Sequence, residues 1–267
     1  MDWLQAVVLG LVQGLTEFLP ISSSGHLVLM PHLFGWQDQG LAFDVAVNTG
    51  TLVAVLYYFR KEVWALVLGF FRSLRPGGLA DNSDGHLAWA VGLATIPVGL
   101  FGLLFKETVS TLGRDPVVIA AASILFGLLL WYADRNGRRE RGIGGLNWRD
   151  AVFIGVGQAL ALIPGASRSG VTMTAGLLLG FDRETAARFS FLMAIPVGLL
   201  AGGLELSEFF QSQPTAREWG VMGVGFLISM VSAFLVIHWL LAWLKSRNMT
   251  PFVIYRLLLG GLILILV

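Results

Sequence analysis

Two short polar stretches interrupt a chain that is otherwise apolar, and both hold residue types suited to phosphate chemistry. The first, QGLTEFLPISSSGH, runs from Gln13 to His26 and contains a carboxylate, three adjacent serines and an imidazole. The second, PGASRSGVT, runs from Pro164 to Thr172 and places an arginine among hydroxyl groups. A serine needs a neighbouring base to act as a nucleophile, and arginine binds phosphate through parallel hydrogen bonds. The two stretches therefore predict the halves of one phosphate site.

The surrounding composition is that of an integral membrane protein. The 267 residues are 55% hydrophobic and only 13% charged. Their mean hydropathy of +0.74 is well above the balance of soluble domains. A net charge of +1 argues against a nucleic-acid partner, and the absence of cysteine excludes disulfides and thiolate chemistry.

Ionisable side chains are costly in such a chain. A charge at the bilayer centre costs about 2.5 to 3.5 kcal/mol on insertion scales, so Glu17 and Arg168 are predicted to be functional. A buried ion pair that only holds the protein together is the alternative, but it leaves the neighbouring hydroxyls unexplained. The hydroxyls expected to form an anion-binding cradle with Arg168 belong to Ser22, Ser23, Ser24, Ser167, Ser169 and Thr172.

His26 follows Ser23 by three residues, one helical turn, so its imidazole could approach a serine oxygen. A lone histidine is more often a hydrogen-bonded core residue than a catalyst. The company of Glu17 and Arg168 favours catalysis here. We therefore expect His26 to handle a proton at this site.

Two further polar residues lie in apolar surroundings. Arg256 could lend a second positive charge to a bound diphosphate, or its head group could extend to the membrane interface, and the sequence favours neither. Asn48 could face a cavity, but an interhelical hydrogen bond is the stronger expectation.

The elements that must position these residues are membrane helices. Spanning about 30 Å of hydrocarbon takes roughly 20 residues. Six segments are predicted to span, namely 43–59, 87–105, 117–132, 189–206, 219–244 and 252–267. Two more apolar stretches, 3–34 and 151–181, are broken by the polar islands. Irregular backbone is tolerated at membrane depth only inside protein or beside a cavity, so each is expected to form a re-entrant pair of half-helices rather than a kinked span.

The chain also repeats itself. A shift of 145 residues places SSSG at Ser22 on SRSG at Ser167, and a shift of 135 places PVVI at Pro116 on PFVI at Pro251. The fold class expected is an all-α polytopic membrane protein with an inverted-topology repeat. Each half would be a re-entrant helix pair plus three transmembrane helices, an odd number of crossings. The whole chain forms one membrane domain, with repeats at about 1–134 and 151–267 and a basic cytoplasmic linker at about 134–150.

The basic residues agree with this topology if the N-terminus is external. The predicted outer loops contain only Lys106, Arg114 and Arg217. The predicted inner loops contain thirteen, namely Arg60, Lys61, Arg72, Arg75, Arg135, Arg138, Arg139, Arg141, Arg149, Arg183, Arg188, Lys245 and Arg247. Such an excess of positive charge is typical of cytoplasmic loops.

The two polar stretches resemble the signature segments of the bacterial undecaprenyl-diphosphate phosphatases of the bacitracin-resistance type. The resemblance runs the length of the chain and includes FSFLMAIPVG at Phe189 and PFVIYR at Pro251. It implies a multi-pass hydrolase of the bacterial cytoplasmic (inner) membrane. Such an enzyme removes the terminal phosphate of a C55 polyprenyl diphosphate, recycling the lipid carrier for peptidoglycan synthesis.

The resemblance also implies residue roles. Glu17, Ser23, His26 and Arg168 match the family's catalytic residues, and the other hydroxyls match its phosphate contacts. In these roles Ser23 is expected to attack phosphorus or position a water, His26 to handle its proton, and Glu17 to hold a metal or orient His26. The resemblance further implies that a divalent cation, Mg²⁺ or Ca²⁺, is required. Many members carry glutamate where this chain has Gln13, so the metal ligands expected here are Glu17 and, less securely, the Gln13 carbonyl oxygen. The partners are the lipid substrate and membrane lipids, and a homodimer is one candidate assembly.

A transporter is the rival from another class. Inverted repeats with broken helices are a transporter feature, and the same cradle could carry a polyprenyl phosphate across the membrane without cleaving it. Transport alone does not require Glu17, Ser23 and His26 together, so the sequence favours hydrolysis.

Overall fold

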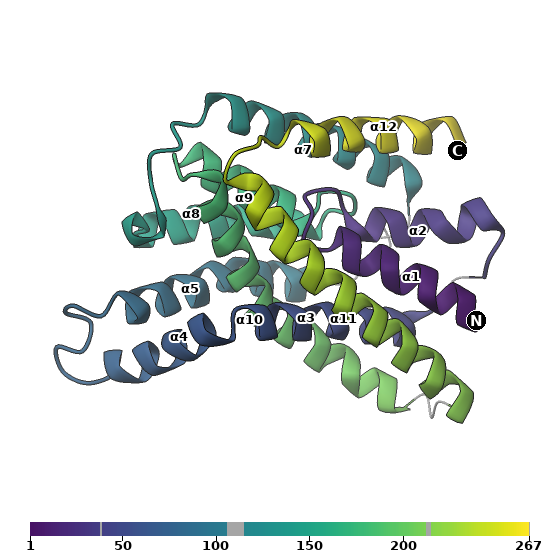
Figure 1. Cartoon of the computed structure of the whole chain (residues 1–267), viewed down its shortest axis with the longest axis horizontal. Coiled ribbons are helices and arrows are strands. Elements are labelled where there is room, and N and C mark those ends of the chain that lie inside the picture. Colours follow the sequence, from purple (N-terminus) through teal and green to yellow (C-terminus); the bar gives the residue numbers. More distant parts are fainter. Residues whose placement is uncertain (38, 106–114, 212–214, 267) are drawn as a thin grey trace.

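The computed structural model describes residues 1–37, 39–105, 115–211 and 215–266, and in this part of the chain every regular element is a helix. Figure 1 shows the helices lying side by side in one bundle. The first half contains α1 (Trp3–Thr16), α2 (Ser23–Phe34), α3 (Leu41–Tyr58), α4 (Arg60–Ser73), α5 (Ser83–Leu104) and α7 (Pro116–Asn136). The second contains η1 (Ile143–Gly145), α8 (Trp148–Ala159), η2 (Leu160–Leu162), α9 (Arg168–Leu178), α10 (Arg183–Gln211), α11 (Ala216–Leu244) and α12 (Thr250–Leu266).

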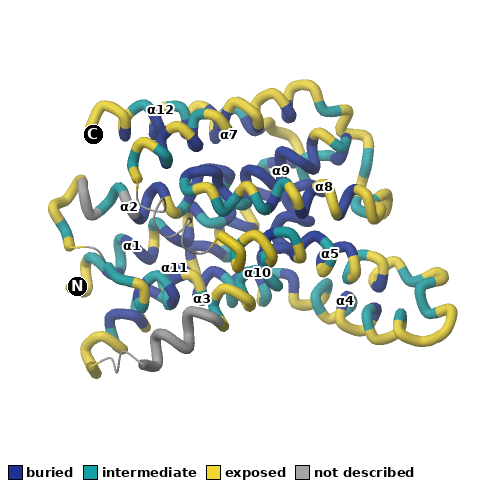
Figure 2. The backbone as a smooth tube through the Cα atoms, turned by 180° about the vertical axis from the view of Figure 1, so that it is seen from behind, coloured by how far each residue is buried: buried dark blue, intermediate teal, exposed yellow. Residues whose placement is uncertain are grey.

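The six predicted spans coincide with α3, α5, α7, α10, α11 and α12. Five of these are long and apolar enough to cross a membrane, and α12 is an apolar helix of 17 residues. Large apolar side chains face outward, with Leu104 75% and Ile265 82% exposed. The buried residues gather at the centre, around α9 and α10 (Figure 2). A chain with its apolar surface outside is a polytopic membrane protein. Of the basic residues assigned to outer loops, Lys106 and Arg114 lie outside the described residues.

The predicted inner loop from Arg60 to Arg75 is instead largely helical. It contains α4, which packs on α5 through Leu66 and Gly69. A Cβ at Gly69 would come within 2.6 Å of the Gly85 backbone, so only glycine permits this approach. Because α4 has 14 residues and basic residues at both ends, its sequence does not look like a span, and the hydropathy criterion missed it.

Both polar stretches coincide with breaks between half-helices, as expected. The first break separates α1 from α2, and the second separates α8 from α9. Ser22 (φ 72°) and Ser167 (φ 68°) each take a left-handed backbone conformation immediately before the next half-helix. Each hydroxyl lies close to that of the serine two positions on, at 3.3 Å for Ser24 and 3.2 Å for Ser169. Positions 145 residues apart thus share one local geometry.

Helices at corresponding positions of the two halves also have corresponding packing partners, each in the other half. Helix α1 packs along α11, and its counterpart α8 packs along α5. Helix α3 packs against its counterpart α10, and α7 against α12, a pair that Figure 1 shows along one edge of the bundle. This is the pattern expected if the halves are related by an approximate two-fold axis. The opposite insertion of the halves and the repeat boundaries stay predictions.

Candidate active site

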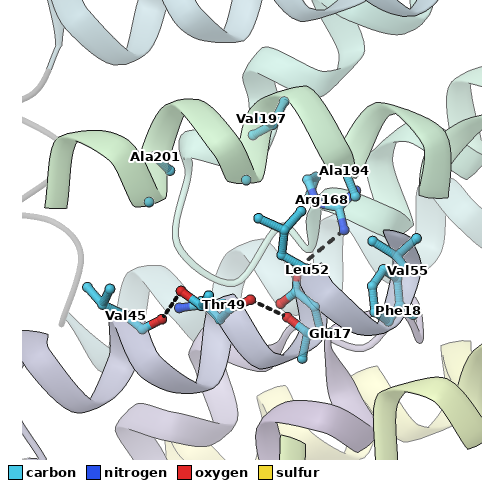
Figure 3. A pocket seen from close by; sticks show the side chains of 14 residues that line it. Glu17, Phe18, Val45, Thr49, Leu52, Val55, Arg168, Ala194, Val197 and Ala201 are labelled. Atoms are coloured by element: carbon cyan, nitrogen blue, oxygen red, sulfur yellow. Dashed lines mark hydrogen bonds and ion pairs between the residues drawn. The ribbon is translucent and has the colours of Figure 1, made fainter. Parts of the chain in front are cut away.

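A pocket between α3 and α10 joins the two breaks. Its volume is about 250 Å³. Glu17 and Arg168 form its charged part, and the side chains of α3 and small residues of α10 continue it away from them (Figure 3). The apolar and small residues along the groove are Val45, Leu52, Val197, Gly198, Ala201 and Gly202. The pocket therefore has a charged head and an apolar body, a shape suited to an amphipathic lipid.

Three phenylalanines are packed together beyond the charged part of the pocket, and Phe18 is the one that lines it. Phe18 packs edge-on against Phe191 with ring centroids 5.1 Å apart, and Phe191 lies 6.3 Å from Phe59. All three side chains are buried. Figure 3 shows Phe18 on the side of Glu17 and Arg168 away from Val45 and Ala201.

The Glu17 carboxylate accepts hydrogen bonds from three other residues of the site. Ser23 donates its hydroxyl proton to Glu17 Oε2 at 2.7 Å. Arg168 donates to the other carboxylate oxygen at 3.2 Å, and the Gln13 amide donates to Oε2 at 3.1 Å. The first polar stretch thus supplies the carboxylate and the hydroxyl, and the second supplies the arginine, as the sequence predicted.

Arg168 is the first residue of helix α9 and lines the pocket. Its side chain is 15% exposed, and besides Glu17 it donates to the Ser190 carbonyl at 3.1 Å. The Ser167 hydroxyl caps α9 by accepting from the Gly170 backbone N–H. The positive end of the helix and the guanidinium therefore lie together, which favours an anion.

The remaining predicted hydroxyls hold the breaks in place. Ser169 donates to the Leu19 carbonyl at 2.9 Å and so ties the second break to the first. Thr172 donates to the Ser190 hydroxyl at 2.7 Å. Ser22 and Ser167 are buried within the turns, and Ser24 is exposed. These hydroxyls therefore help to shape the site, and their contact with phosphate stays a prediction.

His26 has different partners from those expected. Its Nδ1 lies 2.7 Å from the Ser22 carbonyl oxygen and its Nε2 lies 2.5 Å from the Tyr255 hydroxyl. The two rings are also stacked, 9° from parallel. A carbonyl only accepts, so Nδ1 carries a proton, and in a neutral ring Nε2 accepts from Tyr255. Ser23 is paired with Glu17, so the expected Ser23–His26 pair is not formed.

Arg256 matches neither sequence-based alternative. Its side chain is fully buried, so it neither extends to the interface nor reaches the pocket. Its guanidinium donates to carbonyls of both breaks, with Gly165 and Ala166 at 2.9 Å and Pro20 at 3.4 Å. It also donates to the Ser123 carbonyl of α7 at 3.0 Å. Arg256 therefore joins the breaks to α7 and is corrected from a substrate contact to a structural residue.

Comparison with known proteins decides the family. The model of the bacitracin resistance protein BacA family matches residues 6–262. The chain belongs to the BacA family. An undecaprenyl-diphosphatase of Magnetococcus marinus is 58% identical over 98% of both chains. Undecaprenyl-diphosphatase 2 of Stutzerimonas stutzeri is 55% identical, and an undecaprenyl-diphosphatase of Thioalkalivibrio sulfidiphilus is 52% identical, each over 100% of this chain. These relatives are covered over 98% and 99% of their own lengths.

In this BacA family member, the residues near Glu17 offer oxygen atoms to a cation. Gln13 donates to Glu17 and, at 2.7 Å, to Asn48, which confirms the interhelical hydrogen bond expected of Asn48. The Gln13 Oε1 atom is buried without a hydrogen-bond partner. Among the described residues no group of three His, Asp or Glu side chains converges. The donor set is one carboxylate with neutral oxygens, which fits the oxygen preference of Mg²⁺ or Ca²⁺.

Two polar residues of the site were not predicted from sequence. Ser190 lies in FSFLMAIPVG and Tyr255 in PFVIYR, segments that carry the family resemblance, and that coincidence was the only available signal. Their contacts join positions 18 and 229 residues apart along the chain, which local spacing does not reveal.

Tyr255→Phe should lower the turnover rate about tenfold, because the sequence predicts that His26 is catalytic and a small displacement of a catalytic group is enough for such a loss. The ring stack is kept, and only the hydroxyl contact with His26 is removed. If Tyr255 acts through His26, the double variant with His26→Ala is no slower than His26→Ala alone. Steady-state phosphate release by the four proteins measures this, and additive losses would show that Tyr255 acts independently.

Proposed function

We infer that the protein is a membrane-embedded hydrolase that converts undecaprenyl diphosphate to undecaprenyl phosphate and inorganic phosphate. The observation that carries this inference is the meeting of Glu17, Ser23 and Arg168 at the charged end of an apolar groove. The apolar groove suits the first part of a lipid tail, and the charged end suits a diphosphate. The naming of relatives at 52% to 58% identity as undecaprenyl-diphosphatases supports the same activity, and the transporter alternative is not favoured.

The geometry suggests how the chain carries out the reaction. The Ser23 hydroxyl attacks the terminal phosphorus and passes its proton to Glu17, which already accepts its hydrogen bond. The bond from phosphorus to the bridging oxygen breaks, and the lipid monophosphate leaves. Water then releases phosphate from the serine. Direct attack by water, with Ser23 as a ligand only, is the alternative, and phosphate trapped on Ser23 would decide for the covalent route.

Arg168 neutralises charge on the moving phosphoryl group. Its guanidinium has five N–H donors, of which the structure uses those to Glu17 and Ser190, so others stay available for phosphate oxygens. We further propose that Glu17 and Gln13 hold a divalent cation, which would supply additional positive charge to the diphosphate. Location in the bacterial inner membrane and a homodimeric assembly are also proposals.

The direct test is phosphate release from a polyprenyl diphosphate by the purified protein. We expect release that a chelator suppresses, and a loss of about 100-fold or more in Arg168→Ala, as for other electrostatic stabilisers of a transition state. Absence of release from the unmodified protein would refute the hydrolase. Release that a chelator does not affect would refute only the cation.

Gly202→Leu should distinguish long from short substrates. A Cβ at Gly202 meets nothing within 4 Å, so the new side chain folds into the groove rather than into its own helix. We expect kcat/KM for a C55 diphosphate to fall about tenfold, and that for a C5 diphosphate, whose tail is too short to fill the groove, to change little, since a pocket contact of this size is worth one or two factors of ten. Gly203→Leu, next to it but outside the groove, is the control. Equal losses for both chain lengths would place the lipid tail elsewhere.

A further inference from the structure

We propose that a second anion site, separate from the catalytic pocket, lies where α3, α4, α10 and α11 meet, and that it binds the phosphate group of an anionic membrane lipid. A cavity of about 460 Å³ opens there. Its positive side chains come from three helices: Arg60 and Lys61 from α4, Arg188 from α10 and Lys245 from the end of α11.

The start of α4 lines this cavity and lacks a side-chain cap. The helix begins at Arg60 directly after Phe59, and no side chain accepts hydrogen bonds from its first backbone N–H groups. Such a helix end attracts anions, because its free N–H groups carry a partial positive charge. Arg60 and Lys61 lie in this first turn, where the helix dipole disfavours positive charge, and Arg60 donates to the Tyr57 carbonyl at the end of α3 at 2.9 Å. An anion in the cavity would bind the N–H groups and reduce the repulsion at Lys61.

The acidic residues of the cavity do not neutralise it. Glu62 and Glu184 both face Arg188, at 3.0 Å and 3.9 Å. In the part of the chain that the structure describes, no carboxylate pairs with Arg60, Lys61 or Lys245. The Arg188 Nε atom is buried without a hydrogen-bond partner. The cavity therefore has an excess of positive charge, and one of its arginines keeps an unused donor.

The floor of the cavity favours a lipid over a free ion. Phe59, Leu241 and Ala242 line it below the charged groups, and Tyr58 is hydrogen-bonded to His238 at 3.3 Å beside them. A lipid would place its phosphate among the cations and its chains over the apolar floor. Inorganic phosphate shares the charge but gains nothing from that floor. Phe59, Phe191 and Phe18 lie between this cavity and the catalytic pocket.

The test is lipid binding to the full-length protein in detergent, measured by native mass spectrometry with phosphatidylglycerol and phosphatidylcholine. Lys61→Gln combined with Lys245→Gln should weaken phosphatidylglycerol binding about 30-fold. Each cation near an anionic lipid surface contributes roughly a factor of five to the affinity, and the double variant removes two. Arg247→Gln is the matched control, because Arg247 lies two residues from Lys245 and contacts Trp243 instead of the cavity. Arg168→Ala should retain the binding, which separates this site from the catalytic pocket.

Three results would overturn the proposal. Equal binding of the two lipids would show that the site does not require an anionic head group. Equal binding by the double variant and by Arg247→Gln would show that the cavity does not bind the lipid. Displacement of the lipid by millimolar inorganic phosphate would show that the site selects the free ion. A matching thermal midpoint for the double variant and the unmodified protein confirms that both are folded.

Discussion

Glu17→Gln should slow phosphate release about 1000-fold, while the protein stays folded. The amide has the size of the carboxylate and can still accept a hydrogen bond from Ser23, but it cannot take up the proton that Ser23 loses. It also lacks the negative charge that holds Arg168 at 3.2 Å. A group that transfers a proton in the transition state typically contributes a factor of about 100 to 10,000, and Glu17 also positions two partners.

The measurement is single-turnover phosphate release at saturating lipid, since this separates the chemical step from binding. Glu218→Gln is the control for removing a carboxylate, because Glu218 lies in an exposed helix cap at the start of α11, away from the pocket. If Glu17→Gln retained more than a tenth of the rate, Glu17 could not be the base for Ser23.

Arg256→Leu should lower the thermal midpoint of unfolding by about 10 °C. The substitution keeps an apolar stem but leaves the carbonyls of Pro20, Gly165 and Ala166 without the donor that the structure gives them. Each buried group left unpaired costs about 1 to 3 kcal/mol, and each kcal/mol moves the midpoint by roughly 2 to 4 °C in a chain of this size. Activity should fall with stability, because the same carbonyls fix both breaks.

Arg256→Lys keeps the charge but offers fewer donors, so an intermediate midpoint is expected. Arg135→Leu removes an exposed arginine that rests on Trp131 at the end of α7 and serves as the control. Thermal unfolding in detergent, followed by circular dichroism, compares the variants. A midpoint for Arg256→Leu within 2 °C of the control would mean that the two breaks do not depend on this residue.

The sequence predicted the broad organisation of the site and its most costly residues. Hydropathy located six helices, and the polar interruptions located both breaks. Glu17 and Arg168 could be predicted because a charged side chain in an apolar membrane segment costs free energy and is therefore expected to have a function. Their meeting across 151 positions followed from the internal repeat and is now seen as a direct ion pair.

Side-chain partners could not be predicted in the same way. Spacing alone paired Ser23 with His26, but the structure directs Ser23 to Glu17 and His26 to Tyr255. Ser23 and His26 both lie in α2, but their partners come from outside this helix, and spacing within a helix does not reveal such partners. Arg256 was misread for a related reason, because its partners are backbone carbonyls of distant segments, and any residue type can supply those.

The phenylalanines Phe18, Phe191 and Phe59 have a consequence for how the lipid moves. Phe18 lines the catalytic pocket beside Glu17 and Phe191 packs behind it, so the charged part lies at the inner end of the groove. Phosphate and the shortened lipid must then leave the way the diphosphate came, and each competes with the next substrate molecule.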